Sequence, residues 1–191
     1  MPAPSIATLP RLSSTDLSKI ILSQASSNVD ASTPPSNIAI IDVRDDDHIG
    51  GHIKHSIHAP SQTLDIKMPE LVRKLKDKET VVFHCALSQQ RGPSAALKYI
   101  RERDRLLGLS AELQSGSGVG QVLKKNKEEE VVKEGEGKDT RDDEWQDLEE
   151  KKDQKVYILD RGFVGWQEVY GEDPRLTEGY RKEIWKEGYW M

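Results

Sequence analysis

Residues 81–100 read VVFHCALSQQRGPSAALKYI and hold the only cysteine of the chain. An apolar, β-branched run ends at Cys85, five residues separate that cysteine from Arg91, and a helical pattern starts at Gly92-Pro93. Proline is tolerated in the first turn of a helix, because an N–H at that position would have no intrahelical partner. The stretch therefore predicts a strand, a tight loop and a helix in succession.

Two other runs share the composition of the strand before Cys85. IAIIDV (38–43) and VYILD (156–160) are apolar at consecutive positions, which is typical of strands covered on both faces. Amphipathic helical patterns lie beside these runs at 13–24, 68–77, 92–109, 162–171 and 174–190. Strands that alternate with helices predict an α/β domain with a mostly parallel sheet.

The domain organisation follows from composition along the 191 residues. Residues 110–153 are densely charged, rich in glycine and poor in apolar side chains, so they cannot bury enough surface to offset the entropy of ordering. We expect one domain over 1–191, with a flexible charged insertion at 110–153 and a helical extension at 172–191. The insertion is either a solvated, tolerated loop or a segment that binds a partner protein.

Charge and cysteine content restrict the partners and the compartment. The net charge of -5 gives no general attraction to nucleic acid or to anionic membranes, so neither is expected as a partner. No run approaches the roughly 18 apolar residues of a membrane span, and the N-terminus lacks the apolar core of a signal peptide. A single cysteine excludes an internal disulfide and fits a reducing compartment. We therefore expect a cytoplasmic or nuclear protein.

The loop after the second strand has the chemistry of an oxyanion site. Backbone N–H groups of 86–90 can converge on one point, and the N-terminus of the next helix adds partial positive charge there. Arg91 supplies a planar, bidentate donor, and these groups favour the nucleophilic thiolate form of Cys85. Alternatively, Cys85 packs in the core and Arg91 lies on the surface; the strand–loop–helix context favours the reactive interpretation.

Residues at the strand ends are candidates for supporting roles. Asp42 and Asp160 end the first and last runs, and the carboxyl ends of parallel strands share one rim with Cys85. Either aspartate could hold a neighbouring Arg or His near the loop, or act only as a cap or a structural ion pair. His84 precedes the cysteine and is expected to orient the loop by hydrogen bonding rather than to act as a base.

The stretch 45–60 contains four histidines, but Gly50-Gly51 interrupts any helix that would align them, so no metal site is expected.

A second question is the source of a proton. A phosphatase needs a proton donor for its leaving group, and the loop after Cys85 offers only Gln89 and Gln90. The Asp45–Asp47 run, Asp160, the substrate and water all remain candidates.

Three stretches resemble the rhodanese fold. IDVRDDDHIGGHIKHSIHAP (41–60) resembles its first signature, and VVFHCALSQQRGPSAA (81–96) resembles the active loop of its phosphatase and arsenate reductase branch. VYILDRGFVGW (156–166) is similar to the last rhodanese strand and turn, with Arg161 where a second glycine is usual. The resemblance covers 11–109 and 155–171. It implies a rhodanese-like α/β domain with a mostly parallel, five-stranded sheet flanked by helices.

The resemblance also implies an activity. In this fold sulfurtransferases place four residues between the cysteine and the end of the loop, whereas phosphatases and arsenate reductases place five, as this chain does. It implies Cys85 as nucleophile, Arg91 as oxyanion clamp, and the amides of a five-residue cradle: Ala86, Leu87, Ser88, Gln89 and Gln90. Gln90 stands where M-phase inducer phosphatases often carry Glu, and the second cysteine of those enzymes is absent.

We therefore expect a cofactor-free phosphatase of the protein tyrosine phosphatase type, acting on a phosphorylated protein or a small phosphate ester through a cysteinyl-phosphate. The first alternative is an arsenate reductase that takes electrons from glutathione or a glutaredoxin. Thiosulfate sulfurtransfer and a non-catalytic module that binds phosphorylated partners are further alternatives. Function has to be decided by the site and not by the fold.

Overall fold

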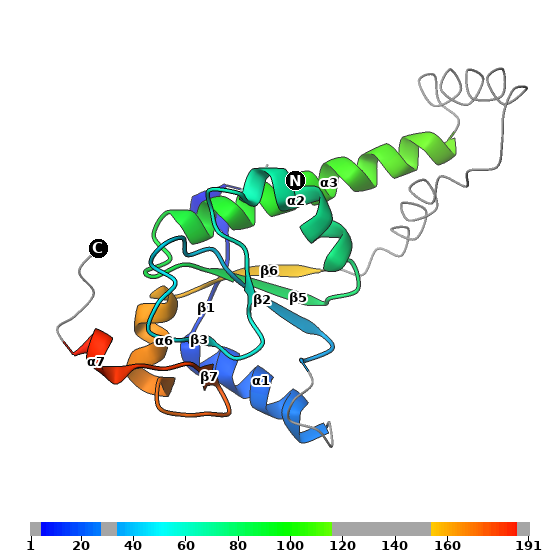
Figure 1. Ribbon diagram of the computed structural model, residues 1–191. Helices are drawn as coiled ribbons and strands as arrows, with labels where there is room; N and C mark the ends of the chain where they lie inside the picture. Colours follow the sequence, from blue (N-terminus) through cyan, green and yellow to red (C-terminus); the bar gives the residue numbers. More distant parts are fainter. Residues whose placement is uncertain (1–4, 28–33, 116–153, 187–191) are drawn as a thin grey trace, which may run out of the picture. The chain divides into compact units, whose positions relative to one another are not determined.

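The computed structural model describes residues 5–27, 34–115 and 154–186. A five-stranded sheet with the order β1-β6-β5-β2-β4 forms the framework (Figure 1). Its strands are β1 (Arg11–Leu12), β2 (Ile38–Asp42), β4 (Ile57–His58), β5 (Thr80–His84) and β6 (Lys155–Leu159). All of its pairings are parallel, so the carboxyl ends of β2, β5 and β6 lie along one rim.

The remaining elements are helices and one small sheet. The helices are η1 (Ile6–Thr8), α1 (Ser14–Ser27), α2 (Leu64–Lys74), α3 (Arg91–Ser115), α6 (Gly162–Tyr170) and α7 (Lys182–Trp185). Strands β3 (His52–Ile53) and β7 (Thr177–Glu178) pair antiparallel. No described helix is long and apolar enough to cross a membrane.

The chain forms two compact units. The first comprises Met1–Ile100 and Asp153–Met191, and the second comprises Arg101–Lys152. The sheet and the carboxyl ends of its strands belong to the first unit, where α2 and the start of α3 cover one face and α1 and α6 cover the other (Figure 1).

Both faces of the central strands are buried, as their unbroken apolar runs predict. Alternate side chains point to opposite faces, so Ile38 and Ile40 join the cluster built from α1 and α6, which includes Phe163 and Trp166. On the other face Phe83 packs against the ring of Tyr99, with centroids 5.4 Å apart. These two layers of side chains hold β2 and β5 in place and so fix the position of the residues that follow them.

The predicted α/β sheet is confirmed, and the three strands end within one residue of their predicted positions. Helix α2 differs, because it begins at Leu64 and encloses Pro69, whereas the sequence analysis placed the proline near the start. Leu64, Met68, Leu71 and Val72 are buried along one side of the helix. This buried apolar stripe stabilises the helical turn that precedes Pro69.

Two predicted boundaries are wrong. Residues 110–115 continue α3, so the predicted insertion does not begin at 110; the rest of it, 116–153, lies outside the described residues. The predicted helical extension at 172–191 is not helical before Lys182, because Leu176 enters the core, β7 pairs with β3 and Gly179 takes a left-handed φ of 64°. Residues 187–191 lie outside the described residues.

Candidate active site

The loop between β5 and α3 holds the cysteine at its base. Strand β5 ends at His84 and α3 begins at Arg91, so 85–90 form the connection. Cys85 is only 4% exposed, and the Ser88 N–H donates to its Sγ at 3.2 Å. Ser88 adopts a left-handed φ of 53°, which turns its amide back toward the sulfur. An N–H donor at this distance stabilises negative charge on the sulfur.

The five predicted cradle residues fall into two groups. Ala86 and Ser88 are buried, while Leu87, Gln89 and Gln90 are exposed at the surface of the loop. The Ser88 Oγ is buried and has no hydrogen-bond partner among the described residues. A buried hydroxyl without a partner is unusual, so this atom is a candidate for contact with a bound oxyanion.

Helix α6 fixes the loop from behind. The Phe163 N–H donates to the Cys85 carbonyl and the Val164 N–H donates to the Ala86 carbonyl, each at 2.9 Å. Gly162 has a φ of 56°, and a Cβ on it would lie 2.4 Å from the Ala86 carbonyl oxygen. Only glycine permits this approach. The sequence analysis quoted this turn but did not connect it with the loop, because the link joins residues far apart in the sequence.

Arg91 is held by two aspartates of the loop after β2. Its Nη1 donates to Asp47 at 2.6 Å and to Asp45 at 3.1 Å, and its Nη2 donates to Asp47 at 2.5 Å. The pKa of Arg91 is raised, mainly by its hydrogen bond to Asp47. The hydrogen bond to Asp45 and the charges of Asp47 and Cys85 also raise it, whereas burial lowers it. A guanidinium has five N–H donors. The Nε–H and the second Nη2–H have no partner among the described residues, and together they form the side-on fork that suits an oxyanion.

The same contacts bear on the search for a proton donor. Burial would raise the pKa of Asp45, but hydrogen bonds from Ser61, the Gln62 N–H and Arg91 outweigh it, and the pKa is lowered. Asp47 is buried against Arg91. The structure therefore makes these two carboxylates ionised partners of the arginine and not proton donors, while Asp46 is exposed.

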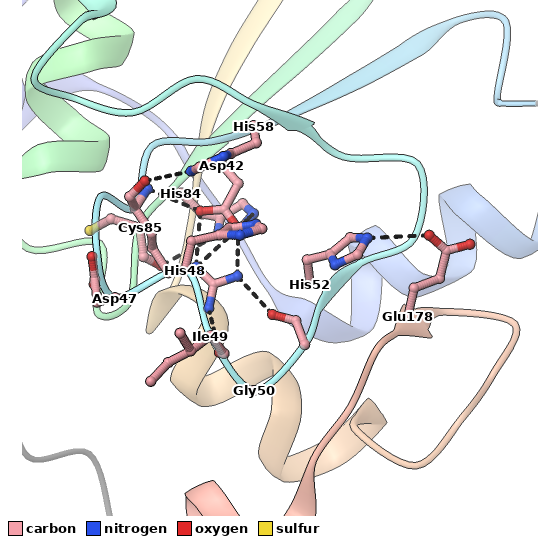
Figure 2. Close-up of polar contacts among 12 residues, drawn as sticks. Asp42, Asp47, His48, Ile49, Gly50, His52, His58, His84, Cys85 and Glu178 are labelled. Carbon is pink, nitrogen blue, oxygen red and sulfur yellow. Dashed lines mark hydrogen bonds and ion pairs between the residues drawn. The ribbon is translucent and has the colours of Figure 1, made fainter.

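Asp42 lies at the centre of a buried ionic cluster, and Figure 2 shows His48, His58 and His84 gathered around it with the Cys85 sulfur pointing away. Arg44, itself fully buried, donates from Nε and Nη2 to Asp42 at 3.0 and 2.7 Å. Burial opposes ionisation of Asp42, yet its interaction with His84 and the hydrogen bonds and charge of Arg44 lower its pKa to about 2. Asp42 therefore supports the rim through this ion pair.

His84 links the cluster to the loop. It is fully buried, and burial lowers its pKa despite the opposing charge of Asp42, whose Oδ2 lies 3.8 Å from Nε2. The Nδ1 lies 3.3 Å from the Cys85 carbonyl. Because a carbonyl only accepts, the neutral ring donates from Nδ1 to the Cys85 carbonyl; the loop-orienting role of His84 stays a prediction.

The other histidines of the stretch 45–60 do not converge on a metal position. His48 and His58 stack with centroids 3.9 Å apart, and His48 lies 5.7 Å from His52. Within the described residues no group of three or more His, Cys, Asp or Glu side chains is arranged to hold a metal ion. Burial lowers the pKa of His48 to about 4. The charge of Asp42 opposes this lowering, and the charge of Arg44 adds to it.

A pocket of about 270 Å³ adjoins the loop on the side of β6. Its lining residues are Arg11, Leu87, Gln89, Asp160, Arg161 and Val164. Arg11 comes from β1 and donates to the Ser88 carbonyl at 3.4 Å and to Asp160 at 3.3 Å. The sequence analysis placed Asp160 on this rim and missed Arg11, whose two-residue strand carries no periodic signal.

Arg161 adopts a conformation that is unfavourable for its residue type. Its φ is 58°, in the left-handed region that costs a residue with a Cβ about 1–2 kcal/mol. A Cβ on Gly165 would lie 2.5 Å from the Arg161 Cβ, so this glycine leaves room for the arginine side chain. Its ion pair with Glu168 is exposed and contributes at most about 1 kcal/mol.

Comparison with known proteins places the chain among relatives of described activity. The rhodanese-like domain family matches residues 23–112. The chain is 52% identical over 132 residues to the dual specificity phosphatase Cdc25 of Arabidopsis thaliana, covering 69% of this chain and 62% of that protein. It is 31% identical over 158 residues to the CDC25-like phosphatase YCH1 of Saccharomyces cerevisiae, covering 77% of each.

A third relative has a different name. The chain is 49% identical over 71 residues to arsenate reductase 2.2 of Oryza sativa subsp. japonica, covering 35% of this chain and 55% of that protein. The chain thus spans less than two thirds of the length of two of these three relatives. The names of the three relatives fit the two reactions that the resemblance implies.

Proposed function

Because the chain belongs to the rhodanese-fold family that contains the CDC25-like phosphatases and the arsenate reductases, we propose that it is a cysteine-thiolate phosphatase. Its substrates are phosphotyrosine-like and small phosphate monoesters. One observation carries the proposal: Cys85 lies at the base of a five-residue loop with an N–H donor on its Sγ, and Arg91 at the end of that loop keeps a two-donor fork unused.

The chemistry follows from this arrangement. The Cys85 thiolate attacks phosphorus, an S–P bond forms, and the ester P–O bond breaks as the leaving oxygen takes a proton. Water then attacks the cysteinyl-phosphate and releases inorganic phosphate and the thiolate. The loop amides and the Arg91 fork hold the non-bridging oxygens in both steps.

The proton for the leaving group has no donor in the loop. Asp45 and Asp47 are ionised partners of Arg91, and Gln90 carries no acidic proton. Asp46, which is exposed, and Asp160, which lines the pocket beside the loop, remain candidate donors together with the substrate and solvent. Phosphates of acidic alcohols such as phenols need this proton least, so phosphotyrosine-like aryl phosphates are the expected substrates.

Arsenate reduction is the second candidate; the similarity to arsenate reductase 2.2 supports it, and the single cysteine of the chain is compatible with it. A phosphatase needs only one cysteine, and so does a reductase that takes two electrons from two external thiols. Cys85 would attack arsenate, water would leave, and glutathione or a glutaredoxin would reduce the adduct to arsenite while being oxidised to a disulfide.

The deciding experiment assays purified protein with p-nitrophenyl phosphate, and with arsenate plus glutathione and glutaredoxin. We expect phosphate release that Cys85→Ser abolishes, and acid quenching during turnover should trap one phosphoryl group on Cys85. Full activity of Cys85→Ser in either assay would overturn the mechanism. The Asp65→Asn variant, which neutralises an exposed carboxylate of α2 that pairs with Lys98, is the matched control for loss of activity during preparation.

The two remaining alternatives have distinct outcomes in the same set of assays. Rapid formation of thiocyanate from thiosulfate and cyanide, without phosphate release, would select the sulfurtransferase. Tight binding of a phosphotyrosine peptide without turnover would select the non-catalytic module.

A further inference from the structure

The pocket beside the cysteine loop lies outside the position expected for a single phosphoryl group, because neither Cys85 nor Arg91 lines it. We infer that this pocket is a subsite for a second anionic group, a carboxylate or a phosphate, on the same aryl phosphate substrate. The inference rests on the proposed phosphatase function and specifies its substrate class.

The location of the pocket supports this role. Two of its lining residues, Leu87 and Gln89, are the exposed members of the loop whose buried members surround the thiolate. A substrate with its phosphoryl group in the loop therefore has its organic part at the mouth of the pocket. Leu87 and Val164 offer apolar contact for a ring, and the pocket has a volume of about 270 Å³.

The charge of the pocket favours an anion. Two arginines and one aspartate line it, which leaves one net positive charge. Arg11 is held by Asp160 and by the Ser88 carbonyl, so its position is tied to the loop itself. Arg161 forms an exposed ion pair with Glu168, and an incoming anion can replace the Glu168 carboxylate as its partner.

The backbone at Arg161 is the strongest argument. The left-handed φ of 58° suits glycine, and the exposed ion pair with Glu168 is too weak to offset the strain of placing a Cβ there. Gly165 beneath it lacks a side chain and so leaves room for the arginine. Strain that the fold does not repay points to a function for the residue that carries it.

The test compares three substrates of the same shape: phenyl phosphate, 3-carboxyphenyl phosphate and 1,3-phenylene bisphosphate. For each we measure kcat/KM at low salt and form the ratio to phenyl phosphate. We expect the ratio for at least one of the two substrates with a second anionic group to fall at least threefold in Arg161→Gly, to stay within twofold in Arg161→Lys, and to fall toward the Arg161→Gly value in 0.5 M salt. Which substrate responds tells whether the second group is a carboxylate or a phosphate.

Two features make the test decisive. Arg161→Gly relieves the backbone strain and therefore folds, which a thermal melt checks. Arg175→Ala is the matched control, because it removes the same charge from an exposed ion pair with Asp173 that does not line the pocket. The inference is overturned if Arg161→Gly leaves all ratios unchanged, or if Arg175→Ala lowers them equally.

Failure of the phosphatase function has a different signature. If the wild-type protein hydrolyses none of the three substrates, titration calorimetry of 3-carboxyphenyl phosphate and the bisphosphate into Cys85→Ser, with and without Arg161→Gly, replaces the kinetic ratio. At least threefold weaker binding in the double variant would support the subsite and reject only the proposed phosphatase activity. Equal binding overturns both.

Discussion

The carboxylate of Asp47 accepts hydrogen bonds from the guanidinium of Arg91 end-on, with Nη1 at 2.6 Å and Nη2 at 2.5 Å from its two oxygens. Asp45 takes the other Nη1 donor. A guanidinium fixed in this way can rotate little, so its side-on fork keeps one direction. The structure thus joins the loop after β2 to the loop after β5 through a charged contact across the rim of the sheet.

Removing one charge from this contact tests its role. We predict that Asp47→Asn lowers kcat/KM for p-nitrophenyl phosphate about tenfold, because a hydrogen bond between charged groups that is worth about 1.5–3 kcal/mol no longer orients Arg91. Affinity for phosphate as a product inhibitor should fall with it. Asp65→Asn, which neutralises an exposed carboxylate of α2, should change neither quantity by more than twofold. An Asp47→Asn enzyme as active as the wild type would show that the contact is only structural.

Gly162 is predicted to tolerate no side chain. In Gly162→Ala the new Cβ meets the Ala86 and Cys85 carbonyl oxygens at 2.4 and 2.5 Å, and the residue keeps a left-handed φ. We expect a loss of more than about 2 kcal/mol in the free energy of unfolding, measured by urea titration, together with loss of turnover at temperatures where the protein is still folded.

The control for this variant is Gly108→Ala. A Cβ there meets nothing within 4 Å, and the position lies inside α3. Alanine in a helix interior is favoured over glycine by about 1 kcal/mol, so this variant should be slightly more stable than the wild type. Equal stability of the two alanine variants would contradict the close packing of α6 on the loop.

Asp42→Asn is predicted to be the most destabilising of the charge-neutralising changes. It leaves the fully buried Arg44 with an unbalanced charge, and removing one partner of a buried pair costs about 3–5 kcal/mol. Asp173→Asn breaks an ion pair with Arg175 that is largely exposed, and should cost less than about 1 kcal/mol. Urea titration of both variants measures the difference, and similar midpoints would argue against a structural role for the buried pair.

Two histidines beside Asp42, the partly buried His48 and the buried His84, predict loss of stability in mild acid. The folded-state pKa of His48 is about 4 and that of His84 is also lowered, mainly by burial, whereas an unfolded histidine titrates near about 6.5. Between these values the unfolded chain binds more protons than the folded one, so the free energy of unfolding falls as the pH drops from about 6.5 toward 4. Asp42, with a pKa of about 2, stays ionised in this window and loses its contribution only below about 4.

A variant separates this effect from general acid sensitivity. His48→Gln removes one of the groups and should make the fall between pH 7 and pH 5 shallower in urea titrations. The groups facing His48 are Asp42, Arg44, His52 and His58, and all of them remain in the variant. An unchanged slope would assign the acid sensitivity to His84 or to other groups.

The framework was predictable because each central strand is buried on both faces and so shows an unbroken apolar run. The strand, loop and helix around Cys85 were predictable for a related reason: the run, the proline and the helical pattern are local signals. Strands β1, β3 and β7 have two residues each and lack a periodic pattern, and they exist because of their partners. Helix α2 was placed too late, since the proline signal was given more weight than the buried Leu64.

The candidate site divides in the same way. Cys85, Arg91 and the five residues between them could be proposed from the strand–loop–helix context and the resemblance to the rhodanese fold, and the aspartates at the strand ends from topology. The pairing of Arg91 with Asp47 and the two bonds from α6 to the loop could not, because each joins residues that only the folded chain brings together. The sequence shows which side chains are present, and the pairings decide which carboxylates are available as proton donors.

The attachment of α6 to the cysteine loop also sets an order of events during synthesis. Phe163 and Val164 leave the ribosome after the whole of 101–152 has been made, whereas Cys85 and Arg91 leave it much earlier. A growing or truncated chain therefore carries its thiol without the two amides that hold the loop closed. Long-range contacts of this kind form late, so the loop around the reactive thiol is completed only after residues 163 and 164 have been synthesised.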